Sequence, residues 1–574
     1  MFLKNYYVKP FIAEFLLAIG VLFYGQYLKL PGSISTGLGI GILLLSIHRF
    51  YKLMMRSAEV KSLALSKPVT YSVAKAKGNK DKTFIGKGFV WQNKHVQRMY
   101  ELSQQETLTK YFDMSKSGGN PAIHGVGYSD EKSISLPNKS LTLQTAVVGG
   151  TGSGKTRLLE SLATQGILRN EPVIIFDPKG DNELVDRMYD VCRRTGREDD
   201  FQFFSLAHPK YSLSYNPMDN FAKPTDLASR MRSIMEVGND PFYADFVWNV
   251  ILGVCKGLMS LGEAITLDNI DKYALGETKD LHRRVKQAYD EVKNKDTEKN
   301  KMLEDAYKSL SNLMEYPGDF FIKVRSNLAP VLSSLTYGEI GTLLSIIPSD
   351  ITWEKTVNKN RVVYFYLGSM LDATVAKNVG RLALQDFLYY VGNIYAFQKD
   401  KDRRPINLFV DEFYNVMFDG YVDLLNKSRG AGVRVTLGMQ TSKDIEAVVD
   451  RAKASQILAN TNNKIFLRTP EKEIAELFQD LYGETIIKER MKTISYSPDS
   501  KEDGNLFGGS AGSRLINKPV PLVDKSHITS LPVGHAFMYT QGENPYKLRL
   551  PIINDKIEKS FMDEVISDDK RKVI

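Results

Sequence analysis

Two apolar stretches near the N-terminus differ from the rest of the chain. Residues 11–28 read FIAEFLLAIGVLFYGQYL, with Glu14 as their one charge. Residues 34–47 form a second run, rich in glycine and leucine, which extends toward Met55 if the basic side chains beside it reach the interface. About 20 largely apolar residues span a bilayer as a helix, and only a tight turn separates the two runs. The pattern predicts a two-helix transmembrane hairpin within residues 1–56.

The charges beside this hairpin predict its orientation. Lysine and arginine residues precede and follow it, whereas the turn carries only Lys29. Positively charged flanks stay on the cytoplasmic side, so both ends are expected in the cytoplasm. The alternative for the first run is a cleaved signal peptide, but no small-residue cleavage site stands out and a second apolar run follows at once. We therefore expect a multi-pass membrane protein whose soluble part is cytoplasmic.

Short apolar runs that alternate with helical stretches begin after residue 140. Residues 141–148 and 173–176 read as buried strands on either side of a helix at 156–168, which is a parallel βαβ unit. The same alternation returns in the second half of the chain and indicates an α/β domain with a doubly wound parallel sheet. The further strand candidates are residues 362–367, 406–410, 433–437 and 464–467.

The middle of the chain has a different composition. Residues 225–345 are rich in Leu, Met, Lys, Glu and Asp and have few β-branched runs, which predicts an all-α insertion. Serine, glycine and aspartate dominate residues 493–513, which indicates a mobile loop. These shifts divide the chain into a membrane anchor at 1–56, the first part of an α/β domain at 57–224, the insertion, and the second part of the α/β domain at 346–574.

Charge and cysteine content narrow the classes of partner and cofactor. The net charge of +9 favours nucleic acid or anionic lipid as a partner, although the same excess over 574 residues also serves solubility. Cys192 and Cys255 are the only cysteines, which excludes a disulfide framework and a cysteine-rich zinc site. The seven histidines show no metal-ligand spacing such as HExxH.

One glycine-rich segment matches the pattern GxxxxGK[ST] in full, between a predicted strand and a predicted helix. The backbone N–H groups of such a loop converge on phosphate oxygens, and the helix N-terminus adds positive potential. The segment predicts an ATP site in which Lys155 reaches the β and γ phosphates and the Thr156 hydroxyl binds Mg²⁺. A plain glycine-rich turn is the alternative, which the strand and helix context disfavours. The motif consists of Gly149, Gly150, Thr151, Gly152, Ser153, Gly154, Lys155 and Thr156.

A second apolar run ends in two carboxylates. Residues 406–410 are followed by Asp411 and Glu412, at the end of a strand where ligands of open α/β sheets bind. In an ATP site, Asp411 would hold Mg²⁺ directly or through water, and Glu412 would orient and polarise the attacking water. A structural strand end is the alternative, because apolar runs that end in Asp-Glu are common.

Two more polar residues end predicted strands. Asp177 follows the strand after the P-loop helix, which places it near the phosphates, although turn chemistry alone explains the Pro178 and Gly180 that follow. Gln440 ends the strand that begins at residue 433, where it would sense the γ-phosphate or the water; a polar strand cap is the alternative.

With these residues, the sequence resembles the type IV coupling proteins, the TraD/TraG group of conjugation systems. The resemblance covers most of the chain and rests on an ordered set of motifs, of which the P-loop alone is generic. The set comprises VGGTGSGKT, VIIFDPKGD, SYNPM at 214–218, LFVDEF, KSRGAGV, GMQTSKDI and ANTNNKIFLRTPEKE at 459–473. The upstream segment IGKGFVWQNKHVQ at 85–97 is similar to the TraD type of integrative conjugative elements.

The resemblance implies a RecA-like motor domain with an inserted all-α domain. It implies a homo-hexamer on a membrane stem in the bacterial inner membrane, which uses ATP to move single-stranded DNA. It implies that the DNA arrives with a relaxase, as part of a relaxosome, and is delivered to the channel of a type IV secretion system. It also points to Arg429, beside the glycines of KSRGAGV, as an arginine finger that acts across the subunit interface.

Position alone leaves alternatives for Arg429 and for the function. The glycines mark a turn after the Asp411-Glu412 strand, which we expect at the edge of the sheet's catalytic face, where a neighbouring subunit is met. A contact to DNA phosphates or a solvated side chain is the alternative. For the whole chain, the alternatives are a double-strand DNA pump resembling FtsK, which the lack of a recognisable winged-helix domain disfavours, and a substrate-receptor scaffold in which ATP serves assembly.

Overall fold

The structure is a computed structural model in which two compact units are distinguished. Residues 8–25, 31–64, 68–76, 80–103, 119–120, 123, 126, 130–235, 241–292, 297–418, 420–498, 507–543 and 545–570 are described. The larger unit comprises Pro68–Val90, Ser133–Leu481 and Gly534–Ile574. The smaller unit comprises Met1–Lys67, Trp91–Lys132 and Tyr482–Val533.

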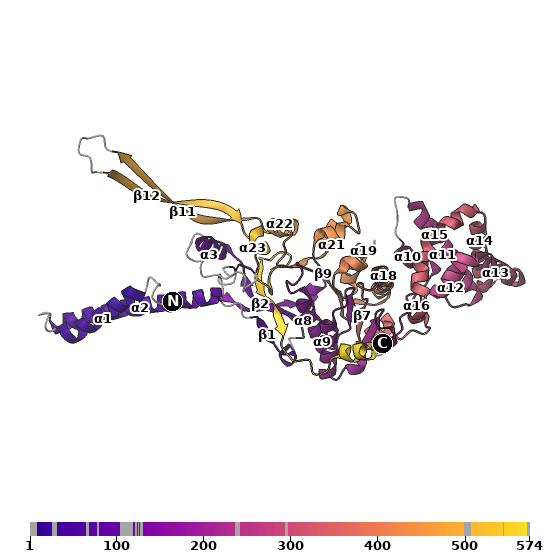
Figure 1. The fold of residues 1–574 in the computed structure, drawn as a ribbon, viewed down its shortest axis with the longest axis horizontal. Coiled ribbons are helices and arrows are strands. Elements are labelled where there is room, and N and C mark those ends of the chain that lie inside the picture. The colour runs from indigo at the N-terminus through magenta and orange to yellow at the C-terminus, as the bar shows by residue number, and fades with distance from the viewer. Residues whose placement is uncertain are drawn as a thin grey trace. The chain divides into compact units, whose positions relative to one another are not determined.

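A single mixed sheet of eleven strands organises the larger unit, as counted over the described residues (Figure 1). Its strands, in spatial order, are β3 (Lys132–Pro137), β2 (Lys82–Val90), β14 (Tyr546–Arg549), β13 (His535–Tyr539), β10 (Asn463–Leu467), β4 (Thr145–Val148), β9 (Val433–Met439), β8 (Ile406–Val410), β5 (Val173–Asp177), β7 (Val362–Tyr366) and β6 (Phe201–Ser205). From β10 to β6 all neighbouring strands are parallel.

The prediction of a purely parallel sheet is wrong on one side. Strands β13, β14 and β2 run antiparallel to their neighbours and extend the parallel part beyond β10. Only residues 540–545 join β13 to β14, and a parallel crossover requires a dozen residues or more. Strand β2 comes from residues 82–90 and its partner β14 from residues 546–549, so segments far apart in the chain contribute to one sheet.

All the parallel strands except the edge strand β6 are buried along their whole length, as strands covered on both faces must be. Every residue of β4, β5, β7, β8, β9 and β10 is buried. The connecting helices are α8 (Lys155–Leu168), α9 (Asn182–Arg194), α18 (Ala373–Phe397) and α19 (Tyr421–Gly430). Since each crossover brings the chain back to the same end of the sheet, the residues that follow β4, β5, β8 and β9 meet at one edge.

Between β6 and β7 the described chain is helical and contains no strand. Its main helices are α10 (Pro224–Arg232), α11 (Pro241–Leu261), α12 (Leu267–Asp271), α13 (Thr278–Val292), α14 (Glu298–Met314), α15 (Gly318–Thr336), α16 (Gly338–Ser345) and α17 (Trp353–Asn358). Two glycines let α11 approach its neighbours closely. A Cβ at Gly253 would lie 2.7 Å from Leu313 Cδ1, and one at Gly257 would lie 2.9 Å from Leu281 Cδ2.

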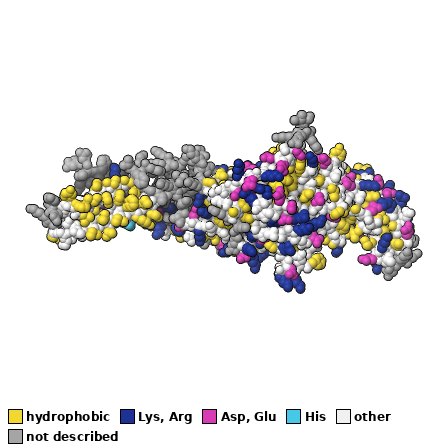
Figure 2. All heavy atoms as spheres, turned by 90° about the horizontal axis from the view of Figure 1, so that it is seen from below, with side chains coloured by type: hydrophobic (Ala, Val, Ile, Leu, Met, Phe, Trp, Pro, Cys, Tyr) yellow, Lys and Arg dark blue, Asp and Glu magenta, His cyan; other side chains and the backbone are white. Residues whose placement is uncertain are grey.

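Two N-terminal helices belong to the smaller unit and pack against each other. Helix α1 spans Val8–Tyr24 and helix α2 spans Gly32–Ala64. Arg49 pairs with Glu14 at 2.8 Å, so the one acidic group of the first apolar run meets a cation of the second helix. Exposed hydrophobic side chains gather over these helices (Figure 2).

The membrane prediction is met by one of these two helices. Within the described residues, only Gly32–Met55 is long and apolar enough to cross a membrane. Helix α1 has 17 residues, fewer than the roughly 20 that a span needs. The structure therefore contains one candidate span, and a hairpin that crosses the membrane twice stays a prediction.

A two-stranded antiparallel arm replaces the predicted loop at 493–513. Strands β11 (Glu484–Pro498) and β12 (Phe507–Pro521) pair residue by residue along their full length, and residues 499–506 lie outside the described part. Serine and glycine signal turns in isolation, but a continuous ladder of hydrogen bonds overrides this weak preference. Helix α3 (Asn93–Ser103) supports the arm, because the Gln97 side chain bonds both backbone groups of Lys488, at 2.7 and 3.1 Å.

Candidate functional site

The loop between β4 and α8 follows the geometry expected of a phosphate cradle. Gly152 and Gly154 adopt φ angles of 70° and 109°, in a left-handed region that residues other than glycine rarely adopt. A Cβ at Gly149 would lie 2.6 Å from Ser153 Oγ and 2.8 Å from Leu467 Cβ, so the loop closes tightly at its start. The loop ends at the N-terminus of α8, where unpaired N–H groups favour an anion.

Lys155 lies inside this loop rather than in solvent. Its side chain is buried, and Nζ donates to the carbonyl oxygens of Gly149 at 2.7 Å and Gly150 at 3.4 Å. Burial lowers the pKa of Lys155, and the negative charges of Asp411 and Glu412 oppose that shift. The ammonium group is therefore held where phosphate oxygens would meet it, with carboxylates that favour its charged form.

Asp411 ends strand β8 directly beside the P-loop helix. Its backbone N–H donates to Phe176 O at 3.0 Å, and its Oδ2 accepts a hydrogen bond from Thr156 Oγ1 at 3.3 Å. Burial, together with the charges of Asp177 and Glu412, raises the pKa of Asp411 to about 6. A buried carboxylate beside a hydroxyl fits Mg²⁺, which binds few protein oxygens and keeps waters and substrate phosphates as its other ligands.

A hydrogen-bonded chain joins three more predicted residues. Gln440 Nε2 donates to Glu412 Oε1 at 2.7 Å, and Thr151 Oγ1 donates to Gln440 Oε1 at 3.1 Å. Glu412 adopts φ 42° and ψ 50°, a left-handed conformation that is costly for a glutamate. This series of hydrogen bonds leads from the end of β8 through the end of β9 to the P-loop, and it holds the Glu412 carboxylate on the side of the phosphate cradle.

Asp177 is buried at the end of β5, and its carboxylate oxygens accept hydrogen bonds from neighbouring groups of the protein. It accepts hydrogen bonds from the N–H groups of Gly180 at 2.8 Å and Asp181 at 2.6 Å, and from the Tyr364 hydroxyl at 2.7 Å. Burial raises the pKa of Asp177. In this arrangement the side chain shapes the turn after β5 and influences Asp411 through its charge.

Sequence reasoning missed the supports that neighbouring loops give to the P-loop. The Gly150 N–H donates to Arg468 O at 2.9 Å, and the Gly534 N–H donates to Ser153 O at 3.2 Å. Arg468 follows β10, which lies next to the P-loop strand β4. Gly534 precedes β13, which lies on the other side of β10. The sequence offered one signal for the first of these supports. Residues 468–470 (RTP) follow β10, and because β10 is parallel to β4, the segments after the two strands lie at the same edge of the sheet.

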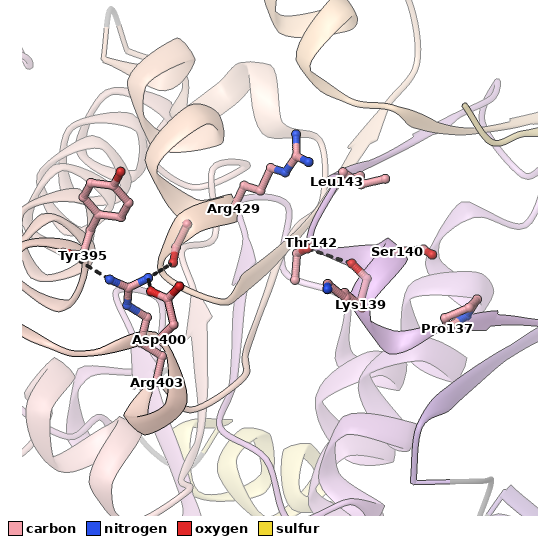
Figure 3. A pocket seen from close by; sticks show the side chains of 10 residues that line it. Pro137, Lys139, Ser140, Thr142, Leu143, Tyr395, Asp400, Arg403 and Arg429 are labelled. Carbon is pink, nitrogen blue, oxygen red and sulfur yellow. Dashed lines mark hydrogen bonds and ion pairs between the residues drawn. The ribbon is translucent and has the colours of Figure 1, made fainter. Parts of the chain in front are cut away.

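Arg429 does not lie with the other predicted site residues. It stands at the C-terminal end of α19, which leads into the start of β9, whereas Gln440 follows the far end of the same strand. Our expectation that Arg429 lies at the catalytic edge of its own sheet is wrong, because a helix that returns to a parallel strand ends at the opposite edge. Its side chain lines a separate cavity there (Figure 3).

Comparisons with known proteins agree with this geometry. Residues 130–316 match a family described as the type IV secretion-system coupling protein DNA-binding domain. Residues 405–533 match the TraM recognition site of TraD and TraG. Together the two family matches span more than half of the chain.

A curated protein and solved structures show the same likeness. The type 4 coupling protein DotL of Legionella pneumophila is 31% identical over 107 residues, which are 18% of this chain and 14% of that protein. The coupling protein TrwB in its unbound form has a TM-score of 0.53 at 16% identity, over 74% of this chain and 88% of that one. TrwB in complex with the GTP analogue GDPNP has a TM-score of 0.53 at 17% identity, over 74% and 89%.

The solved structures establish the fold, and the family matches extend over both halves of the larger unit's sheet. They include the P-loop segment, the Asp411-Glu412 strand end and Gln440, which the structure brings to one edge. The chain belongs to the coupling proteins of type IV secretion systems.

Proposed function

We propose that this protein is an ATPase that hydrolyses ATP at the carboxyl edge of its sheet. The observation that carries the proposal is the convergence of Lys155, Thr156, Asp411 and Glu412 at the end of parallel strands, where open α/β sheets bind ligands. TrwB, which has the same fold, was solved with ADP and Mg²⁺, which supports a nucleotide as the ligand.

Each residue has a role that follows from its position. The N–H groups of residues 149–154 and the Lys155 ammonium bind the phosphates, and Thr156 and Asp411 would hold Mg²⁺. Bound there, Mg²⁺ would neutralise charge on the β and γ oxygens. Glu412 orients and polarises the attacking water, and Gln440 fixes the Glu412 carboxylate at 2.7 Å. Asp177 tunes the electrostatics of Asp411.

We propose further that ATP turnover moves single-stranded DNA during conjugation. The two matching families are described as a DNA-binding domain and as a TraM recognition site, which supports DNA and a relaxosome as partners. The protein would act as a homo-hexamer held at the inner membrane by residues 1–56 and would deliver DNA to the secretion channel. In this assembly the all-α domain at 225–345 is an insertion between the two parts of the motor domain at 57–224 and 346–574.

The ATPase rate under three conditions tests the proposal. The full-length protein in detergent or nanodiscs is assayed with no DNA, with single strands and with duplex. Single strands are expected to stimulate turnover more than duplex does. Stronger stimulation by duplex would favour a double-strand DNA pump, and no turnover under any condition would favour a receptor in which ATP serves assembly only.

A further inference from the structure

A polar cavity of about 820 Å³ lies at the amino-terminal edge of the sheet. Short helix α7 (Asn138–Leu141) and the residues before β4 form one side, and the ends of α18 and α19 with the loop before β8 form the other (Figure 3). The residues that line it are Pro137, Lys139, Ser140, Thr142, Leu143, Tyr395, Asp400, Arg403, Arg429 and Gly430.

Two cations in this cavity are available to a ligand. Lys139 and Arg429 are exposed and come from opposite sides of the cavity. Among the described residues, no hydrogen bond or ion pair is recorded for either side chain. Arg403 differs, because its guanidinium is engaged by the protein itself. Unpaired lysine and arginine side chains across one polar cavity favour an anion with several oxygens, such as a polyphosphate.

The protein holds the Arg429 side of the cavity firmly. Arg403 donates to the carbonyl oxygens of Gly430 at 2.6 Å, Tyr395 at 3.0 Å and Gln398 at 3.1 Å, and so joins the ends of α18 and α19. Gly430 permits this contact, since a Cβ there would lie 2.5 Å from the Tyr395 ring. Arg429 therefore projects from a fixed helix end, which lowers the cost of binding.

The anion cannot be the nucleotide of the same chain. Strand β9 separates Arg429 from Gln440, and its seven residues at about 3.3 Å each span roughly 20 Å. An arginine or lysine side chain does not bridge that distance. The anion that enters this cavity therefore belongs to another molecule.

A second copy of this chain has the complementary surface. At the carboxyl edge, three carboxylates (Asp411, Glu412 and Asp444) and one further cation, Lys179, act electrostatically on Lys155, and a bound triphosphate adds more negative charge there. The amino-terminal edge offers Lys139 and Arg429 instead. Contact between opposite edges is heterologous, the kind of interface that closes into rings. Phe397, 84% exposed and two residues beyond Tyr395, fits the aromatic enrichment of protein interfaces.

We propose that this cavity receives the triphosphate of ATP bound to the P-loop of a second copy, where Lys139 acts as a second cation beside Arg429. The proposal rests on the ATPase function proposed above and adds a residue to its site. Both cations approach from the neighbouring subunit, so they stabilise negative charge that builds on the phosphates only when two copies are in register. Turnover would thereby depend on assembly.

Lys139→Ala in the full-length protein tests this role. Turnover is expected to fall about tenfold or more, whereas ATP binding in the absence of hydrolysis stays unchanged, because the P-loop of each subunit is intact. Lys139→Arg is expected to retain turnover close to that of the unaltered protein. Lys427→Ala is the matched control, since it removes an exposed lysine of α19 that pairs with Asp423 outside the cavity, and it is expected to leave turnover unchanged.

Mixed assemblies separate action across the interface from action within a subunit. Lys139→Ala and Lys155→Ala chains carry two different affinity tags and are co-purified through both. Some interfaces then combine an intact P-loop with an intact cavity, so the mixture is expected to turn over ATP faster than either parent protein alone. Mixtures that turn over ATP no faster than the Lys139→Ala parent would contradict the proposal, as would a Lys139→Ala protein that hydrolyses ATP normally and loses only its stimulation by DNA. If the unaltered protein lacks turnover, the proposed function itself fails.

Discussion

The side-chain amide of Gln440 donates a hydrogen bond to the Glu412 carboxylate over 2.7 Å, although 28 positions separate the two residues in the chain. The bond joins the ends of two neighbouring strands, β8 and β9. It also holds in place a glutamate whose backbone is in a left-handed conformation. A strained residue that is fixed by a side chain from the next strand is characteristic of sites where orientation matters.

The first prediction concerns Glu412. Glu412→Gln is expected to reduce ATP turnover by at least about a hundredfold, because an amide keeps the shape and loses the charge that polarises water. Binding of ATP should persist, since Lys155 and the P-loop are unaltered. Steady-state turnover and equilibrium nucleotide binding measure the two effects, and turnover close to that of the unaltered protein would remove Glu412 from the site.

Gln440→Ala separates orientation from chemistry. The loss of the 2.7 Å bond frees the Glu412 carboxylate, so turnover is expected to fall about tenfold while the affinity for ATP changes little. Gln440→Glu places a like charge against Glu412 and should be the more damaging substitution. If both variants lose ATP binding instead, Gln440 supports the P-loop through Thr151 rather than the water.

The buried Asp411 predicts a pH dependence of stability. Its folded pKa of about 6 lies above the unfolded value, so folding carries a penalty above pH 6 that disappears as the pH falls toward 4. In nucleotide-free protein with chelator, Asp411→Asn is expected to raise the free energy of unfolding at pH 7.5 by up to about 3 kcal/mol.

Thermal unfolding at two pH values measures this effect. The difference between Asp411→Asn and the unaltered protein should shrink at pH 4.5, because folded Asp411 is then almost entirely protonated and the unfolded group is close to its own lower pKa, so the protonation of the two states differs less. Asp423→Asn, an exposed aspartate on α19, serves as the control and should show no such pattern. An equal stabilisation by Asp411→Asn at both pH values, or no stabilisation at pH 7.5, would contradict the stated cause.

Arg429 predicts a defect in turnover without a defect in binding. Arg429→Ala is expected to lower ATP turnover about a thousandfold, because an arginine finger supplies charge to the transition state from outside the binding site. ATP binding to the intact P-loop should be unchanged. Normal turnover that is no longer stimulated by single-stranded DNA would instead assign Arg429 to a DNA phosphate.

Removal of residues 1–56 tests the anchor. The shortened protein is expected to be soluble, because it lacks the apolar side chains exposed on α1 and α2, and to bind ATP as the full chain does. Assembly should weaken, since a membrane raises the local concentration of subunits and aligns them. Light scattering at micromolar concentration without DNA checks this. Hexamers that form as readily as those of the full chain would contradict the prediction.

Sequence reasoning succeeded where a strand is a continuous apolar run. Strand β8 has the predicted bounds, because the run at 406–410 is closed by two carboxylates that cannot remain in a buried ladder. The P-loop and its helix were equally readable, since glycines at fixed spacing have few other uses. These elements place most of the candidate site.

The sequence pattern did not predict strand β2, in which glycines lie against the partner strand. Strand β2 contains Gly86 and Gly88, where a Cβ would lie 2.4 Å from Arg549 O and 2.2 Å from Lys547 O of its partner. Glycine is required by that close approach, yet along the sequence it indicates a turn. The position of Arg429 was readable but misread: it ends the helix directly before β9, and a helix that leads into a parallel strand ends at the amino-terminal edge of the sheet.

The pairing of β2 with β14 determines when the sheet can be completed during synthesis of the chain. Residues 87–90 find their partners only at 546–549, and Val69–Tyr71 pairs with Pro551–Ile553, so neither pairing can form before residues 546–553 have been made. Helices α1 and α2 leave the ribosome long before those residues do. The candidate anchor is thus available to a membrane before the sheet that carries the P-loop is complete.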